Sequence, residues 1–407
     1  MLLLEEVLPR NPFWGRKFSA AGLALKDIQS VDDLRKVPFT TKQELVDDQV
    51  AQPPYGSNLT LPVERYLRLH QTSGTRGVPM RWLDDRESWE WLLGCWRRIY
   101  DTVGLRTADR MFFAFSFGPF LGFWAAFDGA RRLGNFCLPS GGMTTSARLR
   151  LLLDNKISVI FCTPTYALRM AEVAEAEKLD LAGSAVRMLI VAGEPGGSIP
   201  ATRQRIEAAW GARMFDHYGM TEIGSLGIEC LEAPGGFHLL ETECIAEVID
   251  PASGERVPAG REGELVLSNL GRFGSPLLRY RTGDRVVADP QPCPCGSFHL
   301  RLRGGVLGRA DDMLIIRGTN VYPSAIEAIL RRFPDVAEYR IVVRGSGAID
   351  ALRLEVEPRP GATAPDLAGT LVEAVRAEIL FRPEVVLVPA GSLPRGEMKS
   401  QRVLRVV

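Results

Sequence analysis

The chain has 407 residues, enough for two or three domains, and its 46% hydrophobic and 24% charged residues are ordinary for a globular protein. Lys plus Arg and Asp plus Glu both number 49, so the formal charge is zero, without the basic excess of a nucleic-acid-binding protein. We therefore expect a globular protein with no nucleic-acid partner.

The first residues predict no export signal. Met1 to Leu4 are apolar, but Glu5 follows at once, and no basic segment precedes a long apolar one. We expect a cytoplasmic protein, in which the seven cysteines are reduced thiols or metal ligands rather than disulfides.

Residues 1–60 look helical and rich in loops, and the pair Thr41 and Glu44 has the spacing of a capping box. From 61 to 227, short apolar runs alternate with helical patterns. The clearest are a run at 157–162, a helix at 166–178 and a run at 186–191. This alternation predicts a parallel sheet covered by helices.

Residues 111–127 form an uncharged stretch of seventeen residues, interrupted by Gly118, Pro119 and Gly122 and closed by Asp128. A membrane-spanning helix needs about 20 apolar residues. We therefore predict a buried strand, a turn and a helix here, and no membrane span.

The pattern changes after residue 238. Residues 239–288 alternate apolar and polar positions, which predicts an antiparallel sheet or a small barrel. From 309 onward we predict a compact α+β unit with strands at 313–317, 339–343, 352–357 and 385–388 and helices at 323–333 and 366–380. The predicted fold class is α/β: a large N-terminal domain of parallel sheets covered by helices with a small antiparallel sheet or barrel, followed by a small mobile α+β C-terminal domain.

The first chemical motif is a loop of small and hydroxylated residues after the apolar-polar run 66–70. Its members are Thr72, Ser73, Gly74, Thr75, Arg76 and Gly77. Small residues allow backbone N–H groups to turn toward one point, and hydroxyls add donors, which suits a bound phosphate chain. A plain Gly-rich surface turn between two strands is the alternative.

Four further motifs follow in order. AGEPGG (192–197) comes directly after an apolar run, where α/β sheets bind ligands. DHYGMTE (216–222) offers an aromatic ring, a hydroxyl and a carboxylate; YRTGD (280–284) offers an aspartate beside a Gly turn; and GRADDM (308–313) leads to RGTNVYP (317–323). Each motif taken alone also has a structural explanation, such as a turn aspartate, a core tyrosine or a helix-capping glutamate.

Taken together and in this order, the motifs resemble the adenylate-forming superfamily of acyl-CoA synthetases, and most closely its phenylacetate–coenzyme A ligase family. The phrases AGEPGG, YGMTE, YRTGD, GRADDMLIIRGTNVYP and the terminal LPR…K carry the closer match, and the opening NPFWGRKF and DLRKVPFTTKQEL also look like that family. The resemblance covers nearly the whole chain.

The resemblance implies an ATP-dependent acid–thiol ligase. Such an enzyme uses ATP and Mg²⁺ to convert a carboxylic acid to an acyl-adenylate and then transfers the acyl group to coenzyme A, releasing AMP and pyrophosphate. It also implies a large domain at 1–308 with a β-rich subdomain at 240–307, and a small lid at 309–407 that rotates about a hinge near Asp311.

Site residues follow from the same resemblance. The catalytic residues are Lys399 on the lid, Thr221 at the α-phosphate and Glu222, which also binds Mg²⁺. The nucleotide-binding residues are Thr72, Ser73, Gly74, Thr75, Arg76, Gly77, Glu194, Pro195, Asp216, His217, Tyr218, Asp284 and Arg309. The acid pocket takes Phe115, Phe120, Trp124, Ala192, Gly193, Gly219 and Met220, with Gly141, Gly142, Met143 and Tyr166 as weaker candidates. An aromatic lining favours an aryl or arylacetic acid, although core packing is the default reading of the aromatic cluster.

Three positions depart from the family pattern. Val78 stands where family loops commonly carry Lys, Arg76 stands where they commonly have Thr, and Met398 stands where a Gly commonly precedes the catalytic lysine. We expect Arg76 or Arg81 to supply the missing positive charge at the pyrophosphate.

Cys230, His238, Cys293 and Cys295 make a Cys₃His set that suits tetrahedral Zn²⁺, with His299 and Cys244 as spare candidates. The alternative is ordinary buried cysteines. Some relatives in the ligase family that this chain resembles carry a similar set of cysteines and histidine, which favours a structural zinc.

Two other functions stay open at the level of sequence. The enzyme could stop at the acyl-adenylate or pass the acyl group to the phosphopantetheine thiol of a carrier protein. Alternatively, the fold could persist as a catalytically silent nucleotide-binding scaffold, for which Val78 and Met398 are the only support. Family members are often dimers, so a homodimer is possible.

Overall fold

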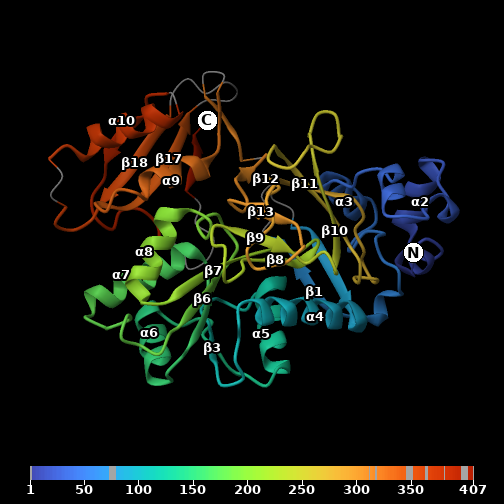
Figure 1. Ribbon diagram of the computed structural model, residues 1–407, viewed down its shortest axis with the longest axis horizontal. Helices are drawn as coiled ribbons and strands as arrows, with labels where there is room; N and C mark the ends of the chain where they lie inside the picture. The colour runs from blue at the N-terminus through green and yellow to red at the C-terminus, as the bar shows by residue number, and fades with distance from the viewer. Residues whose placement is uncertain are drawn as a thin grey trace.

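The computed structural model describes residues 2–72, 79–310, 312–316, 319–344, 352–362, 365–379, 381–395 and 402–406. A central sheet with helices around it forms the body, and the C-terminal α/β part lies against one end of it (Figure 1). Of the helices that the structure describes, none has both the length and the apolar character that a membrane crossing requires.

The central sheet has eight strands in the order β13-β9-β8-β7-β6-β5-β3-β4. The strands are β3 (Arg110–Phe113), β4 (Phe136–Pro139), β5 (Val159–Cys162), β6 (Met188–Val191), β7 (Arg213–Met220), β8 (Gly224–Ile228), β9 (Gly236–Leu239) and β13 (Arg301–Arg303). The pairs from β4 to β7 are parallel, which confirms the predicted parallel sheet. Beyond β7 the pairs are antiparallel, because β7 turns back directly into β8 through the three-residue connection 221–223.

Alternate residues of the parallel strands enter two different cores, because successive side chains of a strand point to opposite faces. Met111 and Phe113 belong to the larger core, whereas Phe112 between them belongs to the second. The larger core includes residues of α4 (Arg86–Thr102) and α5 (Leu121–Arg132). The second includes residues of α6 (Thr145–Asp154), α7 (Pro164–Ala176) and α8 (Pro200–Trp210). The predicted strand, turn and helix at 111–127 are therefore confirmed as β3 and α5.

The N-terminal segment packs into the larger core through Trp14 and its neighbours. Its elements are α1 (Leu2–Val7), α2 (Pro12–Ala20), the 3₁₀ turns η1 (Leu25–Asp27), η2 (Asp32–Lys36) and η3 (Val63–Arg65), and α3 (Lys42–Ala51). The predicted capping box opens α3: the Glu44 N–H donates to the Thr41 hydroxyl at 3.2 Å, and the Thr41 N–H donates back to the Glu44 carboxylate. An antiparallel hairpin follows, made of β1 (Tyr66–Gln71) and β2 (Arg81–Asp85).

The predicted antiparallel region is an open four-stranded sheet, ordered β10-β11-β12-β14. Its strands are β10 (Cys244–Ile249), β11 (Glu262–Asn269), β12 (Tyr280–Val287) and β14 (Gly308–Arg309). The short β14 pairs with β12, which brings Arg309 opposite Asp284. The strand β13, between β12 and β14 in sequence, pairs instead with β9 of the central sheet and so ties the two sheets together.

The C-terminal part has its own core, centred on Ile326, Ile341 and Leu371. It contains the hairpin β15 (Leu314–Ile316) and β16 (Thr319–Val321), the sheet β19-β18-β17-β20, and two helices. The bounds are β17 (Val336–Arg344), β18 (Leu352–Pro358), β19 (Glu384–Leu387), β20 (Val403–Val406), α9 (Pro323–Leu330) and α10 (Leu367–Ile379). The strand β20, which the sequence reading missed, pairs parallel to β17.

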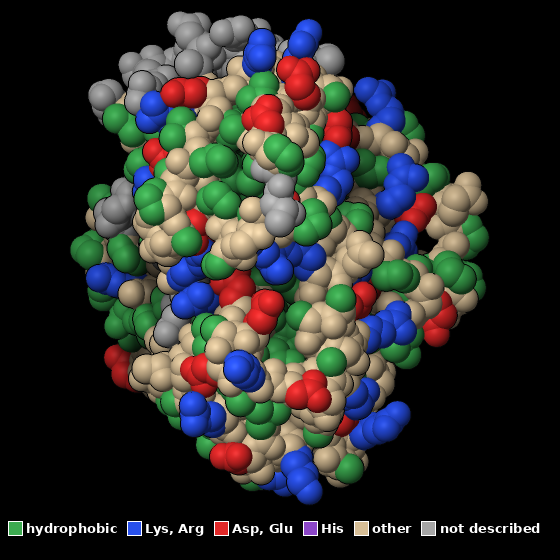
Figure 2. All heavy atoms as spheres, turned by 90° about the vertical axis from the view of Figure 1, so that its left-hand side faces the viewer, with side chains coloured by type: hydrophobic (Ala, Val, Ile, Leu, Met, Phe, Trp, Pro, Cys, Tyr) green, Lys and Arg blue, Asp and Glu red, His purple; other side chains and the backbone are tan. Residues whose placement is uncertain are grey.

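Polar contacts join this C-terminal part to the body. Arg402 Nη2 donates to the Thr165 hydroxyl at 3.1 Å, Arg205 Nη1 donates to the Val336 carbonyl at 3.3 Å, and Arg395 Nε lies 3.8 Å from the Glu172 carboxylate. Basic and acidic side chains are interspersed over this face of the molecule (Figure 2). The face therefore has the mixed charge that the balanced composition predicts.

Candidate active site

Polar residues gather where the parallel strands β5, β6 and β7 end. The loop after β6 carries Glu194, whose carboxylate accepts from the Thr165 N–H at 2.8 Å, just after β5. The same loop carries Ser198, whose hydroxyl donates to Asp216 on β7 at 2.5 Å. The carboxyl ends of parallel strands are the usual ligand-binding edge of an α/β sheet. The structure thus brings the AGEPGG motif and Asp216 together, with Pro195 exposed in the same loop.

Asp216 is set in an unusual electrostatic environment. Burial raises the pKa of its carboxyl to about 7, and the charge of Glu229 adds to this, while the Ser198 hydroxyl and Arg203 oppose it. Arg203 donates to the Glu229 carboxylate at 2.5 Å, and Glu229 also accepts from the Asp216 backbone N–H at 3.0 Å. The Asp216 carboxyl therefore titrates near neutrality, whereas the neighbouring Glu229 carboxylate is paired with Arg203.

His217 lies on the opposite face of β7. Its Nδ1–H donates to the Gly227 carbonyl at 2.7 Å, and its ring lies 4.6 Å from the Trp96 ring. Burial lowers the pKa of His217 to about 4, so the ring is neutral at physiological pH. With Nδ1 committed as a donor, Nε2 is the acceptor nitrogen.

Tyr218, Asp284 and Arg309 form one cluster drawn from three motifs. The Tyr218 hydroxyl donates to Asp284 Oδ2 at 2.6 Å, and Arg309 Nη1 donates to Oδ1 at 3.2 Å. One face of the Tyr218 ring stacks on Phe237 at 5.0 Å. Asp284 is buried, and the cluster holds its carboxylate in a fixed orientation.

Thr221 and Glu222 form the connection between β7 and β8. The Glu222 carboxylate is buried, accepts from the Tyr280 hydroxyl at 3.4 Å and lies 3.7 Å from the Lys42 ammonium at the start of α3. Tyr280 begins the strand that carries Asp284, so β12 contacts both the Glu222 turn and the Tyr218 cluster. A carboxylate oxygen of this kind is a ligand that Mg²⁺ prefers.

The Gly/Ser/Thr loop lies between β1 and β2. Thr72 opens it, with its N–H donating to the Met80 carbonyl at 2.9 Å and its hydroxyl accepting from the Met80 N–H at 3.1 Å. Ser73, Gly74, Thr75, Arg76, Gly77 and Val78 lie outside the described residues, as do Asp311, Met398 and Lys399. The Arg81 guanidinium donates to the Pro54 carbonyl at 3.0 Å.

The aromatic residues assigned to the acid pocket form one continuous cluster. Phe115 stacks on Phe123 at 3.7 Å, Phe120 meets Phe123 edge-on at 6.1 Å, and Trp124 meets Phe117 at 4.9 Å. The Gln71 N–H donates to the Pro119 carbonyl at 2.7 Å, which fixes this cluster beside the hairpin.

The other acid-pocket candidates have different surroundings. Ala192 and Gly193 are partly to fully exposed at the end of β6, and Gly219 and Met220 lie at the exposed end of β7. Tyr166 is fully buried and its hydroxyl accepts from Arg148 at 2.7 Å, while Gly141, Gly142 and Met143 lie in the turn before α6.

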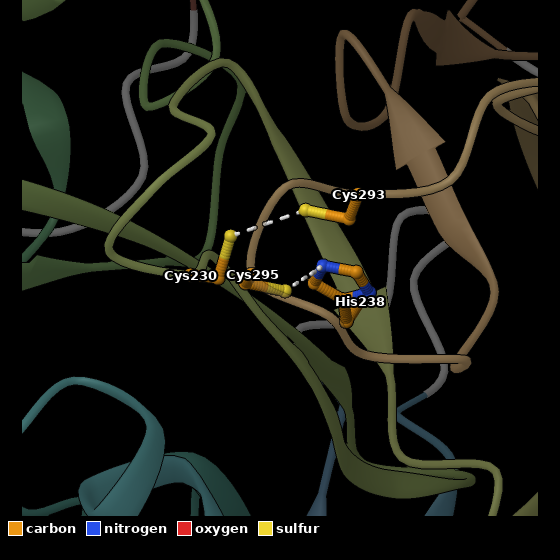
Figure 3. A group of neighbouring side chains, drawn as sticks. All are labelled: Cys230, His238, Cys293 and Cys295. Carbon is orange, nitrogen blue, oxygen red and sulfur yellow. Dashed lines mark hydrogen bonds between the residues drawn. The ribbon is translucent and has the colours of Figure 1, made fainter.

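Cys230, His238, Cys293 and Cys295 converge on one point (Figure 3). Cys230 follows β8, His238 is on β9, and the other two lie in the loop between β12 and β13. The Cys230 and Cys293 sulfurs are 3.6 Å apart, and Cys295 Sγ lies 3.5 Å from His238 Nε2. His238 Nδ1–H donates to the His299 carbonyl at 3.0 Å, which leaves Nε2 to face the sulfurs. Burial lowers the pKa of His238, which favours the neutral ring that a metal requires.

The structure adds residues that the sequence reading did not single out. Lys42 and Tyr280 contact Glu222, and Thr165 contacts Glu194. Arg272 donates to the Thr221 and Glu222 carbonyls at 2.6 and 3.0 Å. Tyr280 was within reach of the sequence because it opens the YRTGD motif, whereas Arg272 lies in a loop with no recognisable pattern.

Two family profiles and several known proteins match this chain over most of its length. The sequence profile described as AMP-binding enzyme matches residues 64–273, and the one described as AMP-binding enzyme C-terminal domain matches residues 318–405. The phenylacetate-coenzyme A ligase of Thermus thermophilus is 35% identical, with 99% of this chain and 94% of the relative covered. That of Escherichia coli is 31% identical over 98% of this chain and 91% of the relative.

Solved structures give the same result and add a conformational detail. A 2-hydroxyisobutyryl-CoA ligase in the postadenylation state, in complex with 2-HIB-AMP, superimposes with a TM-score of 0.94 at 31% identity, covering 100% of this chain and 87% of that one. The same ligase with 2-HIB-AMP and CoA in the thioesterification state gives 0.75 at 32% identity, covering 99% and 87%. The chain therefore superimposes more closely on the postadenylation structure of that ligase than on its thioesterification structure.

Proposed function

The chain belongs to the AMP-binding enzyme family and, within it, to the phenylacetate–coenzyme A ligases, and from that premise we propose that it activates a carboxylic acid with ATP and transfers the acyl group to coenzyme A. AMP and pyrophosphate are the other products. The observation that carries the proposal is the convergence of the family motifs: β12 contacts Glu222 through Tyr280 and Tyr218 through Asp284.

Each part of the nucleotide then has a partner of fitting chemistry. Asp284, with its carboxylate oriented by Tyr218 and Arg309, accepts from the two ribose hydroxyls. The adenine lies between the Glu194–Pro195 loop and residues 216–218. Thr221 contacts the α-phosphate, Thr72 to Gly77 bind the pyrophosphate, and Glu222 holds Mg²⁺, which neutralises phosphate charge when bound. Arg76 or Arg81 supplies the cation that Val78 does not.

We propose a two-domain division, with residues 1–308 as the body, 240–307 as its β-rich part, and 309–407 as a lid that rotates about Asp311. Two observations support it: the C-terminal part has its own core, and the C-terminal profile matches 318–405. Lys399 on the lid then bridges the acyl carboxylate and the α-phosphate during adenylation.

We propose an aryl or arylacetic acid as the substrate. The aromatic cluster that contains Phe115, Phe120 and Trp124 lies beside the hairpin that carries the phosphate loop, and flat aromatic walls favour a flat acid. Ala192, Gly193, Gly219 and Met220 line the end of the pocket nearest the strand ends. The alanine and the two glycines there leave room for the carboxylate to approach the α-phosphate.

We also propose that Cys230, His238, Cys293 and Cys295 hold a structural zinc. Around a tetrahedral zinc, two thiolate sulfurs lie about 3.8 Å apart and a sulfur and an imidazole nitrogen about 3.5 Å apart. The distances of 3.6 and 3.5 Å fit both values, and the ligand atoms all lie within 4.8 Å of one another. The zinc ties the loop between β12 and β13 to the central sheet. Elemental analysis of freshly purified, unchelated protein should find one zinc per chain.

Adenylation is tested by measuring carboxylate-dependent exchange of pyrophosphate into ATP. A panel of aryl, arylacetic and aliphatic acids identifies which class of acid is the substrate. Absence of exchange with every acid would refute the ligase and favour a silent scaffold. AMP release with and without coenzyme A then tests the acceptor. AMP release that coenzyme A does not stimulate would point to a carrier-protein thiol or to a reaction that ends at the adenylate.

The reaction consumes ATP and coenzyme A, and no cysteine among the described residues forms a disulfide, so we place the protein in the cytoplasm. A homodimer is our expectation from the family, and sedimentation of the purified protein measures it.

A further inference from the structure

Arg272 is a fully buried charge in the loop between β11 and β12. Its guanidinium binds Asp84 through two parallel hydrogen bonds of 2.7 Å, from Nε to Oδ1 and from Nη2 to Oδ2. Asp84 is also fully buried. A bidentate Arg–carboxylate pair fixes the plane of the guanidinium as well as its position.

The third nitrogen of Arg272 is directed at the turn between β7 and β8. Nη1 donates to the Thr221 carbonyl at 2.6 Å and to the Glu222 carbonyl at 3.0 Å. Residues 221–223 connect the two strands and lie outside the ladder between them. Buried carbonyls need a donor from elsewhere, and Arg272 supplies it to both residues.

Arg272 and Asp84 together form a clamp on the turn. The Asp84 end of this clamp contacts the hairpin that flanks the Gly/Ser/Thr loop. Asp84 is on β2, and its Oδ2 is 3.1 Å from His70 Nδ1 on β1. The His70 ring stacks on Trp89 of α4 at 5.5 Å, and the Arg68 guanidinium covers the same tryptophan at 3.9 Å. Both strands of the hairpin are therefore fixed to one buried carboxylate, which in turn fixes Arg272.

We propose that Arg272, held by Asp84 and His70, is a positioning residue that sets the Thr221–Glu222 turn relative to the β1–β2 hairpin. The proposal rests on the function proposed above, in which Thr221 and Glu222 contact the α-phosphate and Mg²⁺. The Arg272 side chain binds the backbone of the turn, so the Thr221 hydroxyl and the Glu222 carboxylate stay available to the nucleotide. Arg272 thus acts through the turn and makes no contact of its own with the reacting atoms.

A purely structural ion pair is the alternative, and the chain offers a matched control for it. Arg187 also binds an aspartate through two nitrogens, Nε to Asp109 Oδ1 at 2.8 Å and Nη2 to Oδ2, and it also donates to a backbone carbonyl, that of Gly104, at 3.0 Å. Arg187 immediately precedes β6, at the amino ends of the parallel strands. The two arginines share the paired hydrogen bonds to an aspartate and the bond to a backbone carbonyl. They differ in which edge of the sheet they hold and in burial, because Arg272 is fully buried and Arg187 is partly exposed.

The test compares Arg272→Lys with Arg187→Lys in the full-length protein. Pyrophosphate exchange is measured against ATP and against Mg²⁺ concentration, at a temperature where circular dichroism shows both variants folded. We expect Arg272→Lys to lower kcat about 10- to 100-fold, as loss of a residue that orients a metal ligand typically does, and to raise the Mg²⁺ requirement. Calorimetry should show AMP binding within about threefold of wild type, because the ribose and adenine contacts remain. Arg187→Lys should leave kcat and the Mg²⁺ requirement unchanged.

Equal losses of kcat in the two variants, or a wild-type kcat in folded Arg272→Lys, would overturn the proposal. If Arg272→Lys does not fold, the neutral pair Asp84→Asn with Arg272→Gln is measured against Asp109→Asn with Arg187→Gln under the same criteria. If wild-type protein exchanges no pyrophosphate with any acid, the proposed function fails, and hydrogen exchange then decides about the clamp. Faster exchange at the amides of 220–224 in Arg272→Lys than in Arg187→Lys would support it, and equal exchange would reject it.

Discussion

Asp216 makes the stability of this protein depend on pH in a predictable direction. Burial raises the pKa of its carboxyl to about 7, whereas an unfolded aspartate titrates near 3.9. Between these two values the folded state binds the proton and the unfolded state does not. Stability contributed by protonated Asp216 is therefore present at low pH, falls as the pH rises from about 4 to about 7, and is lost above that.

The magnitude follows from the two values. Relative to its value at low pH, the free energy of unfolding carries a cost from Asp216 of about 1.5 kcal/mol at pH 5 and about 4 kcal/mol at pH 8. Because the residue is partly exposed, solvent screening reduces the difference of about 2.5 kcal/mol to about 1–2 kcal/mol. Asp216→Asn removes this cost and keeps an oxygen to accept from Ser198. We expect the variant to gain about 1–2 kcal/mol relative to wild type on going from pH 5 to pH 8.

Urea unfolding at pH 5 and pH 8, followed by tryptophan fluorescence, measures this gain. Glu229 is present in both proteins, so its titration largely cancels from the comparison. Asp109→Asn is the control. Burial acts to raise the pKa of the Asp109 carboxyl, but hydrogen bonds from Arg187 outweigh burial and hold that pKa below its ordinary value. Asp109 is ionised in both the folded and the unfolded state at pH 5 and at pH 8. The loss of unfolding free energy caused by Asp109→Asn should therefore be the same at the two pH values. An equal effect of Asp216→Asn at the two pH values would refute the reasoning.

Three further predictions concern the metal and the two half-reactions. Cys295→Ser should lose the bound zinc, whereas Cys137→Ser should keep it, and elemental analysis that finds equal zinc in both would remove the metal site. Asp284→Asn should raise the KM for ATP about tenfold, because it weakens charge-assisted hydrogen bonds to the ribose; an unchanged KM in steady-state kinetics would contradict that role. Lys399→Ala should lower pyrophosphate exchange at least 100-fold but spare thioester formation from a synthetic acyl-adenylate, and equal loss of both steps would contradict a two-position lid.

The sequence predicted much of the fold because the relevant signals are local. Thr41 and Glu44 are three residues apart and form the capping box that their spacing indicated. The alternation of apolar runs and helical patterns identified β5, α7 and β6 within a few residues of their observed bounds. The missed strand β20 has only four residues, 403–406, which carry too short a pattern to be separated from a terminal extension.

The candidate site was predictable to the extent that it lies in contiguous motifs. The structure brings Tyr218, Asp284 and Arg309 together as one cluster, and it brings the ligand atoms of the Cys₃His set within 4.8 Å of one another. The individual roles of these residues remain predictions. What the sequence could not show was how the motifs are held: Arg272 and Asp84 are 188 positions apart, and no local pattern marks either one.

The sequence by itself determined the class of chemistry, because the motifs that resemble the family are short and follow one another in a fixed order along the chain. Tertiary structure alone decided which charges are buried and paired, because the pKa of Asp216, the convergence of the Cys₃His side chains and the clamp on the Thr221–Glu222 turn all arise from contacts between segments distant along the chain. Burial removes water from those contacts, and only the folded packing determines where that happens.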